Sequence, residues 1–234
     1  MAYLEGKNLV ASYGVVPILH ECSVEVEKGE LAVIVGPNGA GKSTVMRVLL
    51  GMLDATAGKV LLDGRDISTL STQDRISEGL AFVPQTKNVF PSMTVEENLQ
   101  MGGFIRKDDI SKTIEEVYEL FPILHEKRKQ LAEQLSGGQR QQVAFGRAMM
   151  TKPSVMLLDE PTAGVSPIVM DEIFSNILDV RNAGMAVLMV EQNAQQALNI
   201  ADKGFVLVSG RNEHTGSGKE LINDPEVRKK FLGG

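Results

Sequence analysis

Short runs of β-branched and aliphatic residues alternate along this chain with stretches of helical periodicity. The alternation predicts an α/β fold with a mainly parallel sheet and helices on its faces. Residues 154–158 are apolar nearly throughout, which predicts a central strand buried on both faces. The early runs, with a turn at 27–30, are expected to form an antiparallel β edge. Strands are expected at 3–11, 22–27, 31–35, 58–62, 80–83, 154–158, 186–190, 204–208 and 211–215.

The pattern changes between about residues 92 and 150, where strand signals vanish and charge rises. Ser136 is a candidate N-cap for a helix from Arg140 to Met150. We therefore predict one domain, 1–234, in which an α-helical subdomain, 92–150, is inserted into an α/β core, 1–91 and 151–234. Further helices are expected at 167–181, 192–201 and 223–234. One stripe in the insert has the spacing of a helix that faces a core: Ile110, Ile114, Val117 and Phe121.

Composition narrows the class of protein. The 234 residues, 43% of them hydrophobic, suffice for one large α/β domain. A formal charge of −6, no Trp and three Tyr argue against a nucleic-acid partner. Cys22, the single cysteine, excludes an internal disulfide and is expected to be buried. The sequence shows neither a signal peptide nor an apolar run near the ~20 residues that cross a bilayer, so a membrane role would need other subunits.

A complete G-x-x-x-x-G-K-[ST] loop follows the apolar run 31–35 and precedes the helix-forming stretch 45–50. Its glycines let several backbone N–H groups point at one anion, and the following helix adds its positive end. Lys42 would reach the β- and γ-phosphates, and Ser43 would hold Mg²⁺. The chain is therefore predicted to bind a nucleoside triphosphate. The loop consists of Gly36, Pro37, Asn38, Gly39, Ala40, Gly41, Lys42, Ser43 and Thr44.

Two carboxylates, Asp159 and Glu160, end the buried strand predicted at 154–158. Mg²⁺ prefers hard oxygen ligands, and an attacking water needs a base or a group that orients it. Asp159 is expected to hold the metal shell, and Glu160 is expected to point at the water. Two solvated carboxylates that cap a strand are the alternative, which the phosphate loop disfavours.

A second anion site is predicted where Ser136, Gly137, Gly138 and Gln139 open the helix that follows. The two glycines expose backbone N–H groups, and the helix dipole adds partial positive charge. One triphosphate does not need two helix N-termini built so differently. The second site is therefore expected to serve a nucleotide held by another copy. A plain glycine-rich helix cap is the alternative.

With these three motifs the chain resembles the ATP-binding subunit of an ABC transporter over essentially its whole length. The string Leu-Ser-Gly-Gly-Gln at 135–139 is the most specific part. The resemblance implies a P-loop NTPase fold, ATP and Mg²⁺ as ligands, and ATP hydrolysis. It also implies that two copies close head to tail around two ATP molecules. Each ATP would lie between loop 36–44 of one subunit and residues 136–139 of the other.

The resemblance implies three further roles. Tyr13 matches the aromatic residue that stacks on adenine, and a half-buried strand tyrosine is the alternative. Gln85 matches the glutamine that touches Mg²⁺ and links the two subdomains, and an ordinary loop amide is the alternative. Segment 89–93 matches the neighbourhood that grips a short helix of the membrane subunit. A satellite core under the helical insert is the alternative there.

Two positions depart from the family pattern. Gln192 stands where most members carry a histidine that contacts the γ-phosphate. Glutamine donates a hydrogen bond but carries no charge, so catalysis is expected to depend more on Glu160 and Lys42. Ser166 stands in place of an aspartate, which would weaken coupling across the subunits.

The same positions point to one branch of the family, which energises uptake of leucine, isoleucine and valine. Segments 93–103, 117–122, 190–194 and 231–234 are similar to that branch. Its implied partners are two integral membrane permease subunits, a second, paralogous ATP-binding subunit and an extracytoplasmic solute-binding protein. The expected location is cytoplasmic, on the inner face of the membrane. A urea or short-amide importer is the alternative, and a soluble non-transport ABC ATPase is a less favoured one.

Overall fold

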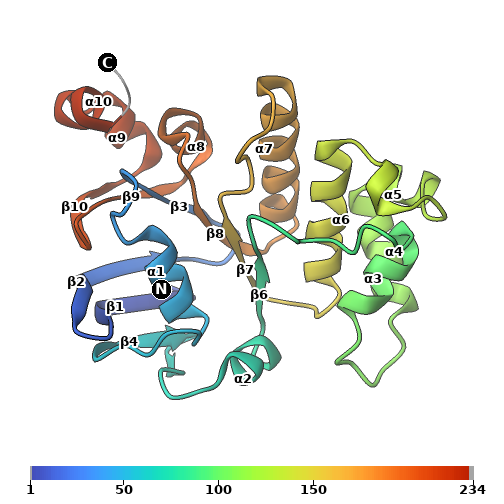
Figure 1. Ribbon diagram of the computed structural model, residues 1–234, viewed down its shortest axis with the longest axis horizontal. Helices are drawn as coiled ribbons and strands as arrows, with labels where there is room; N and C mark the ends of the chain where they lie inside the picture. Colours follow the sequence, from blue (N-terminus) through green and yellow to red (C-terminus); the bar gives the residue numbers. More distant parts are fainter. Residues whose placement is uncertain (1, 232–234) are drawn as a thin grey trace.

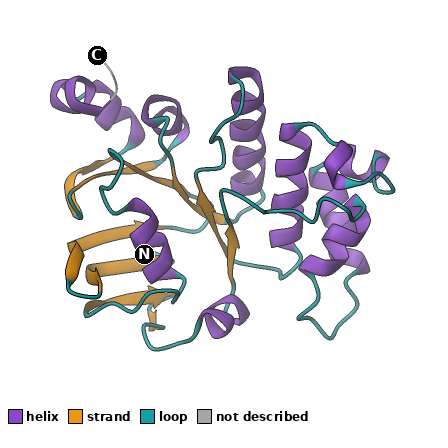
Figure 2. Cartoon of the chain, in the orientation of Figure 1, coloured by secondary structure: helices purple, strands orange, loops and turns teal. Residues whose placement is uncertain are grey.

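Two sheets form the framework of the computed structural model, which describes residues 2–231 (Figures 1 and 2). In the six-stranded sheet every neighbouring pair is parallel except β10 with β9, and the smaller sheet is antiparallel. The smaller sheet has the order β2 (Val16–Val26), β1 (Leu4–Tyr13), β4 (Ala57–Leu62), β5 (Arg65–Asp66). The larger has the order β10 (Arg211–Gly216), β9 (Lys203–Val208), β3 (Leu31–Val35), β8 (Ala186–Val190), β7 (Val155–Asp159), β6 (Leu80–Val83).

Helices cover both faces of the larger sheet and stand beside its β6 edge (Figure 1). Between β6 and β7 the described residues form helices and one isolated bridge, Thr94 with Leu131. None of the helices within 2–231 is both long and apolar enough to span a bilayer. The helices are α1 (Lys42–Leu49), α2 (Thr72–Ser77), α3 (Val95–Gly102), α4 (Ser111–Leu120), α5 (Pro122–Glu126), the 3-10 helix η1 (Ala132–Gln134), α6 (Gly137–Met149), α7 (Pro167–Asn182), α8 (Ala194–Ile200), α9 (Gly218–Asn223) and α10 (Pro225–Phe231).

Alternate residues of the central strands pack into two different hydrophobic clusters. In β3, Ala32 and Ile34 pack with α1 and the antiparallel sheet, where Cys22 is also buried. Val33 and Val35 pack on the other side, with side chains from α6, α7 and α8. A strand that is buried on both faces is apolar at every position, which is the pattern the sequence shows. The predicted α/β class is confirmed, whereas the subdomain boundaries at 92 and 150 stay a prediction.

Several elements differ from those that the sequence predicts. β2 begins at Val16, not at residue 22, because Gly14 in the left-handed region (φ 61°) turns the chain directly back from β1. The first residues of β2 are exposed, so they lack the alternation that marks a strand. In the tail, α9 ends at Asn223 and Pro225 starts a separate helix. Residues 232–234 of the predicted tail helix lie outside the described residues.

A buried arginine fixes the carboxyl end of α1. Arg75 of α2 is 3% exposed and donates hydrogen bonds to the carbonyl oxygens of Val48 (2.7 Å) and Leu49 (2.8 Å). It also donates to those of Ser68 (2.6 Å) and Leu70 (3.1 Å). The last carbonyls of a helix have no partner within the helix. In α1 the backbone N–H groups of residues 50–53 reach several of them, and the Arg75 guanidinium adds donors to Val48 and Leu49.

We expect Arg75→Met to lower the free energy of unfolding by about 3 kcal/mol, because four buried or half-buried carbonyls would each lose a donor. Urea unfolding of the two proteins measures the difference. Arg65→Met is the matched control: its pair with Glu78 (3.0 Å) is exposed, and we expect a loss below about 1 kcal/mol. Equal losses in the two variants would contradict the capping role of Arg75.

Candidate functional site

Three strands that lie side by side end at the same edge of the larger sheet. β3 pairs in parallel with β8, and β8 pairs in parallel with β7. Val190, the last residue of β8, is level with Ile34 and with Asp159. The segments that follow these strands therefore meet at one edge, where α/β sheets commonly bind ligands.

The segment after β3 is a glycine loop that leads into α1. Gly36, Gly39 and Gly41 have φ values of 151°, 79° and 101°, a region that other residues avoid. There is also no room for a side chain at Gly36, because a Cβ there would overlap the carbonyl oxygen of Leu207. The backbone consequently curls around the first turn of α1, where free N–H groups and the helix dipole favour an anion.

Lys42, the first residue of α1, is held inside this loop. Its ammonium group donates to the carbonyl oxygens of Gly36 (2.9 Å) and Pro37 (3.2 Å), and the residue is only 5% exposed. Burial lowers the pKa of Lys42, while the nearby carboxylates of Glu160 and Asp159 act in the opposite direction. The structure thus positions a buried amine at the centre of the loop.

Two neighbouring hollows bring most of the predicted site residues together. One, of about 370 Å³, is lined by Asn38–Thr44, Ile18 and Glu160. The other, also about 370 Å³, is lined by residues that include Ser43, Gln85 and Asp159. Ser43 lines both hollows, so the hollow that Glu160 lines adjoins the hollow that Asp159 lines.

The oxygens in the second hollow suit a magnesium ion. Asp159 Oδ1 is buried and has no hydrogen-bond partner among the described residues. Burial, with the charge of Glu160 beside it, raises the pKa of Asp159. The Gln85 Nε2 atom donates to Glu160 Oε2 (3.0 Å), which leaves the amide oxygen for another partner. A carboxylate, an amide and the Ser43 hydroxyl are the hard ligands that Mg²⁺ takes.

Gln192 reaches the loop from the other side. With Gly36, Pro37 and Asn38 it lines a third hollow, of about 260 Å³. Lys230 of α10 lines the same hollow, although α10 is remote in sequence from every motif. The sequence offers no signal for Lys230. A signal did exist for Glu191, the fully buried residue before Gln192: a carboxylate directly follows the apolar run 186–190.

Tyr13 lies at the end of β1 and is 43% exposed. It is not among the described residues that line the three hollows. Its hydroxyl accepts a hydrogen bond from Arg47 Nη1 (3.2 Å), and Arg47 lines the second hollow. The tyrosine is therefore connected to the site through one side chain. Its exposed ring leaves the predicted stacking on a base sterically open.

The second predicted anion site lies on a different part of the molecule. The capping box is formed: Ser136 Oγ accepts from the Gln139 N–H (3.2 Å), and Gln139 Oε1 accepts from the Ser136 N–H (3.2 Å). A Cβ on Gly138 would meet the carboxylate of Glu172, the exposed end of a flexible side chain of α7. α6 stands across the β6–β8 strands from α1 (Figure 1). Of the described residues, none from 136–139 lines the three hollows.

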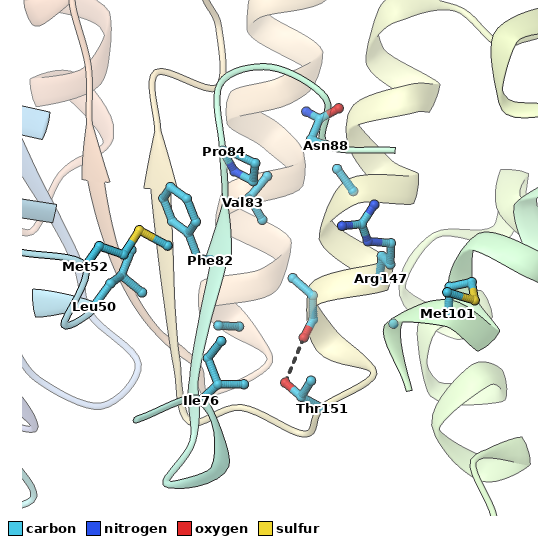
Figure 3. A pocket seen from close by; sticks show the side chains of 14 residues that line it. Leu50, Met52, Ile76, Phe82, Val83, Pro84, Asn88, Met101, Arg147 and Thr151 are labelled. Atoms are coloured by element: carbon cyan, nitrogen blue, oxygen red, sulfur yellow. Dashed lines mark hydrogen bonds between the residues drawn. The ribbon is translucent and has the colours of Figure 1, made fainter. Parts of the chain in front are cut away.

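An apolar groove of about 320 Å³ runs between β6 and α6 (Figure 3). Phe82 and Pro84 line it on the β6 side, and Arg147 lines it on the α6 side, stacked 4.8 Å from the Phe90 ring centre. Within segment 89–93 Phe90 is exposed, whereas Val89 packs against the core. The contact of this segment with a membrane subunit stays a prediction. The groove and the second hollow share Leu50, Met52, Phe82 and Pro84.

The fold and site define a P-loop nucleotide-binding domain: a glycine loop between a buried strand and a helix, with two acidic residues ending a neighbouring strand. The family follows from comparison with known proteins. A family model described as "ABC transporter" matches residues 19–163, and the chain belongs to this family. The chain is thus an ATP-binding, ATP-hydrolysing subunit of a transporter.

Similar proteins cover nearly the whole chain. The high-affinity branched-chain amino acid transport ATP-binding protein BraG of Pseudomonas aeruginosa is 44% identical over 223 residues, which is 95% of this chain and 96% of BraG. The probable branched-chain amino acid transport ATP-binding protein LivF of Archaeoglobus fulgidus is 38% identical over 97% of both chains. The crystal structure of the ADP conformation of MJ1267, an ATP-binding cassette of an ABC transporter, superposes with a TM-score of 0.90 at 31% identity, covering 100% of both chains.

We expect Lys42→Ala to weaken ATP binding by about 100-fold or more, because it removes a buried cation from the phosphate loop. Isothermal titration of ATP into the purified protein measures the affinity, and thermal unfolding shows whether the variant is folded. Lys59→Ala is the matched control, since Lys59 pairs with Asp66 on the surface. An unchanged affinity in a folded Lys42→Ala protein would remove the lysine from the phosphate site.

Proposed function

We propose that this chain is the ATP-hydrolysing subunit of an importer of branched-chain amino acids. The observation that carries the substrate class is the 44% identity to BraG over nearly the full length of both chains, followed by the similarity to LivF. The working complex would contain two integral membrane permeases, a second, paralogous ATP-binding subunit and an extracytoplasmic solute-binding protein. The chain would then sit on the cytoplasmic face of the membrane.

The proposed nucleotide site is shared between two ATP-binding subunits. Within one chain the phosphate loop and residues 136–139 stand on different sides of the β6–β8 strands. The capping box uses the Gln139 N–H, whereas the N–H groups at the first positions of α6 have no partner inside the helix. These groups could meet a γ-phosphate only if the nucleotide belonged to a facing subunit. ATP would therefore bind the two subunits together, and hydrolysis would release them.

The proposed chemistry is an in-line attack of water on the γ-phosphorus. Lys42 and the loop N–H groups hold the β- and γ-phosphates, and Ser43, Gln85 and Asp159 would hold Mg²⁺. The ion, when bound, would neutralise negative charge that develops on the β- and γ-phosphates. The Gln85 amide occupies one oxygen of Glu160, so the other is left to accept a proton from the water. Gln192 donates a hydrogen bond to the γ-phosphate and supplies no charge.

The groove between β6 and α6 is the proposed seat for a short helix of a permease. It presents apolar side chains to solvent, among them Met52 (52% exposed) and Met101 (40% exposed). Phe82 and Pro84 line both this groove and the hollow that contains Gln85. A shift of residues 84–86 would therefore change the shape of both the groove and the hollow. This continuity supports the proposed coupling between hydrolysis and transport.

We expect Glu160→Gln to reduce ATP turnover by about 10²- to 10⁴-fold, the usual effect of losing a positioned base, while ATP binding persists. Phosphate release measures turnover, and isothermal titration measures binding. Glu119→Gln is the control, because Glu119 is an exposed carboxylate of α4. Turnover at the wild-type rate in Glu160→Gln would exclude Glu160 as the base.

The substrate class is tested by transport. We expect the chain to co-purify with two integral membrane proteins encoded beside it, and we expect vesicles with the reconstituted complex to accumulate labelled leucine when ATP and the binding protein are present. Uptake of labelled urea in the same vesicles is the comparison. Accumulation of urea without leucine would overturn the amino-acid assignment, and co-purification with no membrane protein would overturn the transport role.

A further inference from the structure

A carboxylate that the proposed chemistry does not use lies fully buried behind the site. Glu191 follows β8 directly and is 0% exposed. Its Oε1 atom accepts hydrogen bonds from the N–H (3.1 Å) and the hydroxyl (2.8 Å) of Thr162. Its Oε2 atom accepts from the N–H groups of Gln192 (3.0 Å) and Asn193 (3.4 Å). Burying a carboxylate is costly, and this cost is offset by donors on both oxygens.

The two oxygens of Glu191 bind two different loops. Thr162 belongs to the segment after β7 and lies two residues beyond Glu160, whereas Gln192 and Asn193 belong to the segment after β8. A further bond, from Asn193 Nδ2 to Thr162 Oγ1 (3.0 Å), closes the network between the same loops. The Glu191 N–H donates to the carbonyl oxygen of Ile34 (3.1 Å), so the network is also tied to the strand that leads into the phosphate loop.

The segment that carries Glu160 needs such support. Glu160 has a φ of 44°, in the left-handed region that non-glycine residues occupy only when their surroundings impose it. Two backbone hydrogen bonds hold this residue. The Glu160 N–H donates to the carbonyl oxygen of Val190 (2.9 Å), and the Ala163 N–H donates to the carbonyl oxygen of Glu160 (3.1 Å). Both place residue 160 itself. The bonds from Glu191 to Thr162 fix the other end of the turn.

We infer that Glu191 is a positioning residue that holds the Glu160 turn and the Gln192 segment in one arrangement beside the phosphate loop. This inference rests on the proposed roles of Glu160 and Gln192. Residues 163–166, of which 163, 164 and 166 are exposed, continue directly from Thr162. A displacement of these residues by a facing subunit would consequently be passed through Glu191 to Gln192. Contact between subunits would thereby set the geometry on both sides of the γ-phosphate.

Glu191→Gln interrupts the bonds to one of the two loops with almost no change in the shape of the side chain. One oxygen is replaced by an NH₂ group, which cannot accept, so the donors on one loop lose their acceptor. We expect kcat to fall about 10- to 100-fold, as for a displaced catalytic group, while KM and the affinity for ATP stay within about threefold. Glu119→Gln on the exposed face of α4 is the matched control. A wild-type kcat, or a parallel loss of ATP affinity, would overturn the inference.

A double-mutant cycle tests whether Glu191 acts through Thr162. Thr162→Val removes the hydroxyl and keeps the backbone N–H, so it breaks one bond to Glu191 and the bond from Asn193. We expect the kcat of the double variant to be higher than the product of the single effects predicts, because both changes interrupt one network. Independent, multiplicative effects would overturn a link through Thr162.

Amide hydrogen exchange, followed by NMR, tests the same link without reference to catalysis. In Glu191→Gln we expect the Thr162 and Gln192 amides both to exchange about tenfold faster or more, with no change at Leu157 and Leu188 in the strands. Faster exchange in only one loop, or an equal increase in the strands, would contradict positioning by Glu191. If the wild-type protein hydrolyses no ATP, the proposed function fails, and the exchange result still decides whether the two loops are joined.

Discussion

The parallel alignment of β3, β8 and β7 is the constraint on which the site depends. Val190 pairs with Ile34 on one side and with Asp159 on the other, so the three strands end at one level. Each of these strands is buried on both faces, and a register shift would move large apolar side chains into differently shaped clusters. Core packing thus fixes the relative positions of the phosphate loop, Glu160 and Gln192.

Carboxylates outnumber cations at this edge of the larger sheet, and this excess of negative charge affects which form of the nucleotide can bind. The charges of Glu160, Asp159 and Glu191 all raise the pKa of Lys42, against the larger effect of its burial. Arg47 is the second cation near Asp159. Such an acidic excess would repel a bare triphosphate, particularly where burial reduces screening by water. A triphosphate with Mg²⁺ carries less negative charge, and Asp159 Oδ1 offers an unpaired oxygen to the ion. We therefore propose that the site takes the magnesium complex in preference to the free nucleotide.

The sequence predicted the central strands and the phosphate loop well because each has a local cause. Buried parallel strands are continuous apolar runs, and the loop needs glycines at fixed positions. Arg75 was missed because two of its partners, Val48 and Leu49, lie 26–27 residues away, and no local pattern marks a buried charge that remote groups satisfy. For Glu191 the carboxylate after an apolar run was a local signal, but its bond to Thr162, 29 residues away, is visible only in the fold.

α6 gives the two ends of the proposed mechanism a physical connection. Its first residues are the predicted anion site, and Arg147, near its other end, lines the apolar groove. A 13-residue helix is about 20 Å long, so α6 spans the distance between these two sites. Gly146 lets α6 pack tightly, since a Cβ there would lie 2.7 Å from Val117 and 2.9 Å from Leu99. If a permease helix seats in the groove, as we propose, a displacement of α6 there would also reach residues 136–139 at its other end.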